Sequence, residues 1–177
     1  MSEHKGVWVF SESNDLTIEM LGKGRELADK LQAELAAIVI GNNVQNKANG
    51  LIKYGADKVL VADNVGLERF QAEAYLGILQ NLAATYRPEI VMIGSTRNGK
   101  PLAARLATRL ETGCVPDCTR LSVDENRRLI GERITYGGNA IAKIAFKSKP
   151  QIVTVPSRAF EKPESKDRNG QVVKHDF

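Results

Sequence analysis

The segment IVMIGSTRNGKPLAARLATRL, residues 90–110, decides the fold class. It begins with a continuous apolar run, turns between two glycines and continues with leucines four residues apart. A run without alternation is typical of a strand covered on both faces of a parallel sheet. The leucine spacing predicts a helix over residues 101–110, and Pro101 suits its first turn, where the missing N–H needs no partner. The segment is therefore the strand, turn and helix of an α/β fold.

Three more apolar runs precede this unit, and helical patterns separate them. The runs are VWVF at residues 7–10, AAIVI at 36–40 and VLVA at 59–62. The helical patterns cover residues 16–31, 43–54 and 70–86, and Asn14 or Asp15 could cap the first. This order predicts a doubly wound, mainly parallel sheet with helices on both faces and right-handed crossovers.

After residue 120 the pattern changes to strands with one wetter face. Residues 140–147 alternate with period two, residues 129–134 could form their hairpin partner, and residues 152–155 read as a return to the buried sheet. We therefore expect a mixed or antiparallel edge, and one domain over residues 1–160. Residues 161–177 carry four acidic and four basic side chains and little apolar surface to offset their ordering entropy, so we expect a polar linker or arm there.

Composition excludes several classes of function. The 177 residues suffice for one core, and 25 basic residues against 21 acidic ones are scattered without aromatic residues between them, which argues against a nucleic-acid partner. No apolar run has the length of a signal peptide or a membrane span, so we expect no membrane insertion and a cytoplasmic protein.

Histidine and cysteine usage offers no catalytic or metal site. His4 and His175 lie near the two termini, which rules out a Ser-His-Asp, Cys-His or zinc site inside the core. Cys114 and Cys118 have neither redox nor zinc spacing. We interpret them as small apolar residues near the core, with a labile thiol pair as the alternative.

The string GSTRNGKP, residues 94–101, follows the phosphate-binding loop pattern through Lys100. It fails at Pro101, where that loop needs a hydroxyl for magnesium, and this argues against hydrolysis of a nucleoside triphosphate. A glycine-rich turn before a helix still presents free N–H groups to a polar or anionic group, and a turn required for conformation alone is the other reading. Arg105 and Arg109 share a helix face that is either solvated or docks an acidic surface.

The string ITYGGNAIAKI, residues 134–144, places paired glycines between two expected strands. Gly137 and Gly138 permit a plain hairpin turn, or the close approach of another backbone or ring. Tyr136 and Asn139 beside them add an aromatic face and an amide, which favours a contact site.

Several strings in constant order resemble the alpha subunit of electron-transfer flavoproteins, over residues 6–160. They are YGADKVLVAD at 54–63, FQAEAYLGIL at 70–79, PEIVMIGSTRNGKPLAARLATRLETG at 88–113, VPDCTRL at 115–121 and ITYGGNAIAKI. The resemblance is to the amino-terminal domain of that subunit, whose fold is similar to adenine-nucleotide alpha-hydrolases. No sequence like the family's FAD-binding carboxyl-terminal domain follows, so we expect either a truncated subunit or a stand-alone relative.

The resemblance implies an electron carrier rather than an enzyme, in a heterodimer with a beta subunit. It implies electron transport from flavin dehydrogenases, such as the acyl-CoA dehydrogenases of fatty acid beta-oxidation, to a quinone reductase or other acceptor. FAD in the assembled protein would be held mainly by the absent domain and the partner, with none expected in this chain alone. In electron-bifurcating members a second flavin of the beta subunit faces this domain. That implies flavin contacts from Thr96, Tyr136, Gly137, Gly138 and Asn139.

Two other classes share a similar layout. Universal stress proteins, the main alternative as stand-alone nucleotide-binding modules, resemble one another through G-x2-G-x9-G-[ST]; here Gly94 and Gly99 are present, but the later glycine pair is missing. Adenine-nucleotide-dependent ligases and hydrolases carry S-G-G-x-D-S after the first strand, where this chain reads SESND without glycine. This class ranks third.

Overall fold

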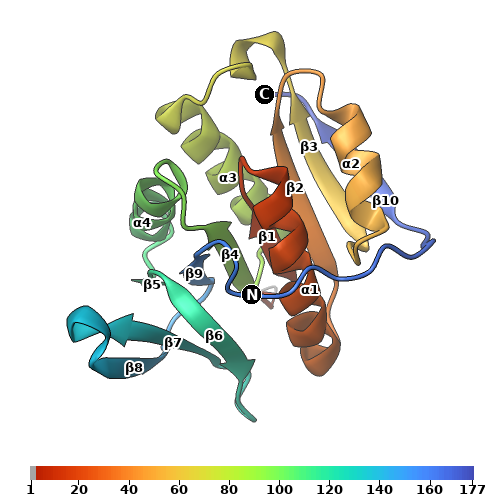
Figure 1. The fold of residues 1–177 in the computed structure, drawn as a ribbon. Helices are drawn as coiled ribbons and strands as arrows, with labels where there is room; N and C mark the ends of the chain where they lie inside the picture. The colour runs from red at the N-terminus through yellow and green to blue at the C-terminus, as the bar shows by residue number, and fades with distance from the viewer. Residues whose placement is uncertain (1–2) are drawn as a thin grey trace.

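A computed structural model describes residues 3–177 (Figure 1). The first half of the chain alternates strands and helices as its apolar runs predict. Its elements are β1 (Val7–Phe10), α1 (Asn14–Leu31), β2 (Leu35–Gly41), α2 (Gln45–Ile52), β3 (Lys58–Asp63), a 3-10 turn (Val65–Leu67), α3 (Ala72–Tyr86), β4 (Ile90–Gly94) and α4 (Gly99–Arg109). The second half is rich in strands. These are β5 (Cys114–Val115), β6 (Cys118–Val123), β7 (Leu129–Thr135), a turn (Tyr136–Gly138), β8 (Ala140–Ala145), β9 (Gln151–Val155) and β10 (Gln171–His175).

The main sheet has seven strands in the order β10-β3-β2-β1-β4-β9-β5, and every neighbouring pair is parallel. Helices cover both of its faces, which confirms the predicted fold class. Strands β1, β2, β4 and β9 are buried along their whole length. This burial explains why their sequences are continuous apolar runs, because neither face of such a strand meets water.

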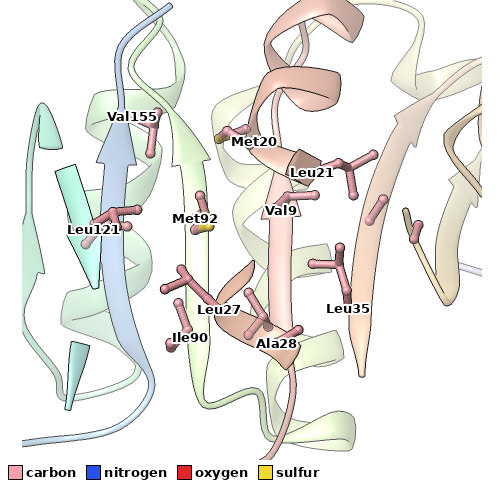
Figure 2. Packing of buried hydrophobic residues seen from close by; sticks show 14 of the residues in the cluster. Val9, Met20, Leu21, Leu27, Ala28, Leu35, Ile90, Met92, Leu121 and Val155 are labelled. Carbon is pink, nitrogen blue, oxygen red and sulfur yellow. The ribbon is translucent and has the colours of Figure 1, made fainter. Parts of the chain in front are cut away.

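Two hydrophobic clusters lie on opposite faces of this sheet. On one face α1 packs over β1 and β4, with Met20, Leu21 and Leu27 pointing at the strands (Figure 2). On the other face α3 and α4 bury residues such as Leu79 and Leu106 against the opposite sides of the same strands. Alternate residues of each strand therefore serve different clusters, and both helical layers depend on one sheet.

The antiparallel strands form a sheet of their own, in the order β6-β7-β8, instead of joining the edge of the main sheet. The predicted hairpin of residues 129–134 and 140–147 is confirmed as β7 and β8. Leu121 and Leu129 of the small sheet join the cluster on the α1 face, and Figure 2 shows Leu121 in it. The expected return strand is β9, which inserts between β4 and β5.

The segment from Glu161 onward differs from a loose arm, because it packs and ends in a strand. Lys162 pairs with Asp15 of α1, and Arg168 pairs with Asp57 before β3. Strand β10 then lies parallel to β3 and forms one edge of the main sheet. Its two valines supply apolar contacts to opposite faces: Val172 packs against one cluster and Val173 against the other.

A buried carboxylate fastens the two sheets together at the amino-terminal ends of the parallel strands. Glu89, directly before β4, is 0% exposed. Its oxygens accept two hydrogen bonds from Arg127, at 2.6 and 3.1 Å, and one from Lys149 at 2.6 Å. Arg127 belongs to the turn between β6 and β7, and Gln151 of β9 binds the same turn through the Arg127 carbonyl. The carboxylate thus ties the small sheet to the main one.

Candidate functional site

The loop between β4 and α4, residues 94–99, is held by tight backbone contacts at the carboxyl end of the main sheet. Gly94 packs on Ser11 and Leu16, and a Cβ there would come within 2.6 Å of the Ser11 hydroxyl. A Cβ on Gly99 would overlap the carbonyl oxygen of Gly94. Both glycines are therefore required by close packing of the loop on itself and on the segment after β1.

The Thr96 hydroxyl joins this loop to the segment between β1 and α1. Its Oγ1 accepts a hydrogen bond from the Gly99 N–H at 2.8 Å, which satisfies one free donor at the start of α4. The same hydroxyl donates to a carboxylate oxygen of Glu12 at 2.6 Å. Thr96 thus has one lone pair left for another contact. The negative charge of Glu12 beside the loop is unfavourable for a phosphate group, which needs positive charge there.

Asp117 and Lys100 form an ion pair on the other side of the loop, at 2.8 Å. The Asp117 backbone N–H donates to Thr154 Oγ1 at 2.9 Å, and that hydroxyl lies 2.6 Å from the hydroxyl of Ser95. Partial burial raises the pKa of the Asp117 carboxyl, but hydrogen bonds from Lys100 and Ser95 outweigh burial and hold the pKa below its ordinary value. Lys100 is therefore already paired with Asp117, and Pro101 lies in the first turn of α4 as expected.

The turn between β7 and β8 projects exposed groups at the end of the small sheet. Tyr136, Gly137 and Gly138 have φ values of 51°, 64° and 100°, so the paired glycines allow a left-handed turn that other residues adopt with strain. Tyr136 is 84% exposed. Asn139 closes the turn by donating through Nδ2 to the Tyr136 carbonyl at 3.0 Å.

Next to this turn, a cross-strand pair extends the exposed apolar surface. Ile134 of β7 stands opposite Ile141 of β8, and the two are 55% and 63% exposed. Large apolar side chains at such exposure, gathered with Tyr136, are typical of a contact surface. We call Ile134, Tyr136 and Ile141 the hairpin patch.

Four of the five expected flavin-contact residues are consecutive in one turn, and the fifth, Thr96, lies in the loop between β4 and α4. Tyr136, Gly137, Gly138 and Asn139 share one turn, at the outer end of the small sheet (Figure 1). Thr96 lies in the β4–α4 loop and bonds with Glu12 and Gly99, toward β1 and α1.

The two arginines and two cysteines singled out in the sequence have structural surroundings of their own. Arg105 and Arg109 of α4 both pair with Glu73 of α3, so they clamp two helices together. Cys114 and Cys118 are free thiols. Burial raises the pKa of Cys114 to about 11, and burial together with the neighbouring Cys114 raises that of Cys118 to about 12. Both are protonated at neutral pH, which supports the interpretation as small apolar residues over a labile pair.

Sequence reasoning missed the partners of the loop. Glu12 meets Thr96 from 84 residues away, and Thr154 meets Ser95 across 59 residues. A polar string SESND directly after a buried strand was the available signal, because the carboxyl ends of neighbouring parallel strands meet at one edge.

The alternation of parallel strands and helices, with a glycine-containing loop after β4 and a separate antiparallel hairpin, defines a doubly wound α/β domain. A family model described as "Electron transfer flavoprotein domain" matches residues 7–177. The chain therefore belongs to the electron transfer flavoprotein family.

Several similar curated proteins are named alpha subunits of this family. The chain is 43% identical to the electron transfer flavoprotein subunit alpha of Clostridium acetobutylicum, over 95% of this chain and 52% of that protein. It is 40% identical to the subunit alpha of Thermoanaerobacterium thermosaccharolyticum, over 99% of this chain and 56% of that one. The lactate dehydrogenase (NAD(+),ferredoxin) subunit LctC of Acetobacterium woodii is 36% identical, over 92% of this chain and 40% of that protein. The chain spans about half the length of the curated relatives it matches, which agrees with one domain of such a subunit.

Residues 3–177 contain neither a cluster of metal-binding side chains nor a helix suited to span a membrane. Within these residues no three histidine, cysteine or carboxylate side chains gather where they could hold a metal ion. None of the helices there combines the length and the apolar character that crossing a bilayer requires.

Proposed function

We propose that this chain is the domain of an electron-transfer flavoprotein alpha subunit that docks a beta subunit. In this role it helps pass electrons from flavin dehydrogenases, such as acyl-CoA dehydrogenases, to a quinone reductase or another acceptor. Membership of the family supports the electron-transfer role. The one observation that supports docking is the exposed hairpin patch on a sheet with an open edge.

The small sheet offers a partner both side chains and backbone. Among residues 3–177, strand β8 has a hydrogen-bonded strand neighbour only in β7, so its outer N–H and C=O groups are available. Its sequence, AIAKIA, carries a single charge. A flat apolar edge of this kind pairs readily with a strand of another chain unless something covers it. A beta subunit that covers this edge would bury the hairpin patch in the same contact.

We also propose that the turn at Tyr136 to Asn139 touches a flavin held mainly by other parts of the assembly. Apart from each glycine itself and its two chain neighbours, no described residue has an atom within 4 Å of a Cβ placed on Gly137 or Gly138, so a flat ring has room to approach the backbone. The turn can offer one face but no enclosure, which supports a cofactor carried by a second domain or subunit. When bound, FAD would supply the redox chemistry, and the turn would position it. Thr96 could contribute only through its remaining lone pair.

Co-purification with the beta subunit of the source organism tests the docking role. Ile141→Lys places a charge in the hairpin patch, and we expect it to weaken the complex by at least about tenfold, since a buried interface charge costs more than about 1 kcal/mol. Val65→Lys is the matched control, because Val65 is 75% exposed and lies outside the small sheet. Equal affinity of both variants, measured by titration calorimetry, would contradict docking through this patch.

The flavin contact is tested separately in the reconstituted heterodimer. Asn139→Ala should lower flavin affinity or shift the flavin potential, whereas Asn126→Ala, in the exposed turn between β6 and β7, should change neither. An unchanged affinity and potential in Asn139→Ala would remove the turn from the flavin site while leaving docking intact.

Nucleotide binding of the universal-stress-protein type is the second candidate. A hollow of about 240 Å³ opens at the carboxyl ends of β1 and β2, lined by Glu12, Asn42, Lys47 and Tyr75 among others. The carboxylate of Glu12, bonded to Thr96, counts against a phosphate group at the adjoining loop. Calorimetric titration of the chain with ATP and AMP decides, and tight binding would favour this candidate over the electron-transfer role.

A further inference from the structure

Three side chains form a continuous contact from the core of the main sheet to its β10 edge. Trp8 of β1 is 4% exposed, and its ring centroid lies 6.3 Å from that of Tyr86 in an edge-to-face arrangement. Tyr86, the last residue of α3, lies 5.6 Å from the ring of His175 in β10. Tyr86 of α3 and His175 of β10 thus connect the buried indole of Trp8 to the edge strand of the sheet.

The contact between Tyr86 and His175 is also a hydrogen bond suited to proton transfer. The phenolic oxygen lies 3.0 Å from His175 Nε2. A phenol becomes strongly acidic when it loses an electron, so oxidation of tyrosine near neutral pH requires a base within hydrogen-bond reach. Neutral imidazole is such a base, and Nε2 accepts when the ring proton is on Nδ1.

Tyr75 shows that this arrangement is not general for tyrosines of the same core. Its hydroxyl lies 3.4 Å from the carbonyl oxygens of Ile40 and Leu67, which accept hydrogen bonds but do not take up a proton. Burial raises the pKa of Tyr75 above its ordinary value. Among the described residues, neither hydrogen-bond partner of the Tyr75 hydroxyl is a base, whereas the hydroxyl of Tyr86 lies against His175.

We propose that Trp8, Tyr86 and His175 form a proton-coupled one-electron relay. A one-electron oxidant, such as a photoexcited or peroxide-derived radical, first removes an electron from the Trp8 indole. Tyr86 then gives an electron to the indole cation, and its O–H proton moves to His175 Nε2. The O–H bond breaks as the N–H bond forms, and the products are neutral tryptophan, a neutral tyrosyl radical and an imidazolium. The oxidising equivalent thereby leaves the sheet interior for the β10 edge.

The charged side chain of Lys58 lies near the Tyr86 ring and affects how easily that ring carries a positive charge. The Lys58 ammonium lies 5.8 Å from the Tyr86 ring centroid and pairs with Glu34 at 2.8 Å. The Glu34 carboxylate partly neutralises the Lys58 ammonium. The ion pair therefore disfavours a positive charge on the Tyr86 ring less than an unpaired lysine would. Transfer of the proton with the electron avoids that charge altogether.

The chain contains one tryptophan, so a short ultraviolet pulse that ionises indole starts the reaction at Trp8 in the full-length protein. Transient absorption should show the tryptophan radical decaying as a tyrosyl radical appears, more slowly in D2O than in H2O. Tyr86→Phe keeps the ring but removes the phenol, and should lengthen the tryptophan-radical lifetime by at least about tenfold. His175→Gln keeps a hydrogen-bond acceptor without a base, and should slow the transfer and abolish the isotope effect.

Tyr75→Phe is the matched control and should behave as the original protein, and circular dichroism checks that each variant is folded. The relay is refuted if Tyr86→Phe leaves the lifetime unchanged, or if the tyrosyl signal persists in Tyr86→Phe and disappears in Tyr75→Phe. A lifetime that responds to Tyr86→Phe but not to His175→Gln would refute the role of His175 as the proton acceptor.

Discussion

The two ends of the parallel sheet use their carboxylates in different ways. At the amino-terminal ends Glu89 is 0% exposed and receives hydrogen bonds from two cations of different segments. At the carboxyl ends Glu12 meets a single hydroxyl of Thr96, and Asp117 pairs with a half-exposed lysine. The first carboxylate is buried between two cations, whereas the carboxylates at the second end lie in contacts that water can reach. We therefore expect the buried ion pairs of Glu89 to contribute more to stability than the exposed ion pair of Asp117.

The largest effect is expected from Glu89→Ala. Removing the buried carboxylate leaves Arg127 and Lys149 without their anion and detaches the small sheet from β4, so we expect a loss of about 3 kcal/mol in the free energy of unfolding. Urea unfolding monitored by Trp8 fluorescence measures it. A loss near that of a surface ion pair would show that the buried ion pairs of Glu89 contribute no more than the exposed one of Asp117.

Acidification sharpens the same prediction. Burial raises the pKa of Glu89, but hydrogen bonds from Arg127 and Lys149 outweigh burial and lower it below the ordinary 4.5. A depressed folded-state pKa means that the unfolded chain binds the proton first, so this stability is present above pH 4.5 and is lost as the pH falls through the folded-state pKa. Glu89→Ala should therefore flatten, though not abolish, the acid dependence, since Asp117 and Asp124 also have lowered pKa values.

Gly99→Ala should have the next largest effect, at the opposite end. The added methyl group overlaps the Gly94 carbonyl oxygen, so the loop backbone must move, at a cost of about 2 kcal/mol. Gly77→Ala in α3 is the control: nothing among the described residues lies within 4 Å of its Cβ, and we expect about 0.5–1 kcal/mol of added stability. Thermal unfolding compares the two variants. Equal melting temperatures would mean that the loop between β4 and α4 accommodates the added methyl group without a cost in stability.

Thr96→Val removes a hydroxyl that both accepts and donates. The Gly99 N–H and the Glu12 carboxylate each lose a partner, but water can reach them in part, so we expect a loss of about 1 kcal/mol. Hydrogen exchange of the first amides of α4 should accelerate in this variant. Unchanged exchange rates would show that the hydroxyl does not hold the helix start.

Lys100→Met is expected to matter least. The Lys100 and Asp117 side chains are 48% and 35% exposed, and ion pairs at such exposure contribute less than about 1 kcal/mol. Unfolding in low and high salt should give nearly the same stability for this variant. A loss as large as that of Glu89→Ala would erase the contrast between the two ends.

Much of the main sheet was predictable, because its strands are buried on both faces. The four early runs and residues 152–155 became β1 to β4 and β9. Strand β10 escaped prediction because only Val172 and Val173 are apolar, and each needs a cluster built by distant residues. The cap of α1 is Ser13, whose side chain accepts from Leu16, and not Asn14 or Asp15, which lie inside the first turn.

The candidate site was predictable only in its local parts. The turn at Gly137 and Gly138 follows from two glycines between strand patterns, since a left-handed turn is a local property. The bond between Thr96 and Glu12 depends on two loops that only the sheet order brings together. The same holds for Glu89, whose partners lie 38 and 60 residues away along the chain.

Strand β10 has a consequence for biosynthesis. Its partner β3 ends at residue 63, so a ribosome must add roughly a hundred residues before β10 is synthesised, which takes on the order of 5–20 s. During this interval the edge of β3 that later pairs with β10 has no strand partner. Chaperones that shield such edges would have their greatest influence on this domain in those seconds.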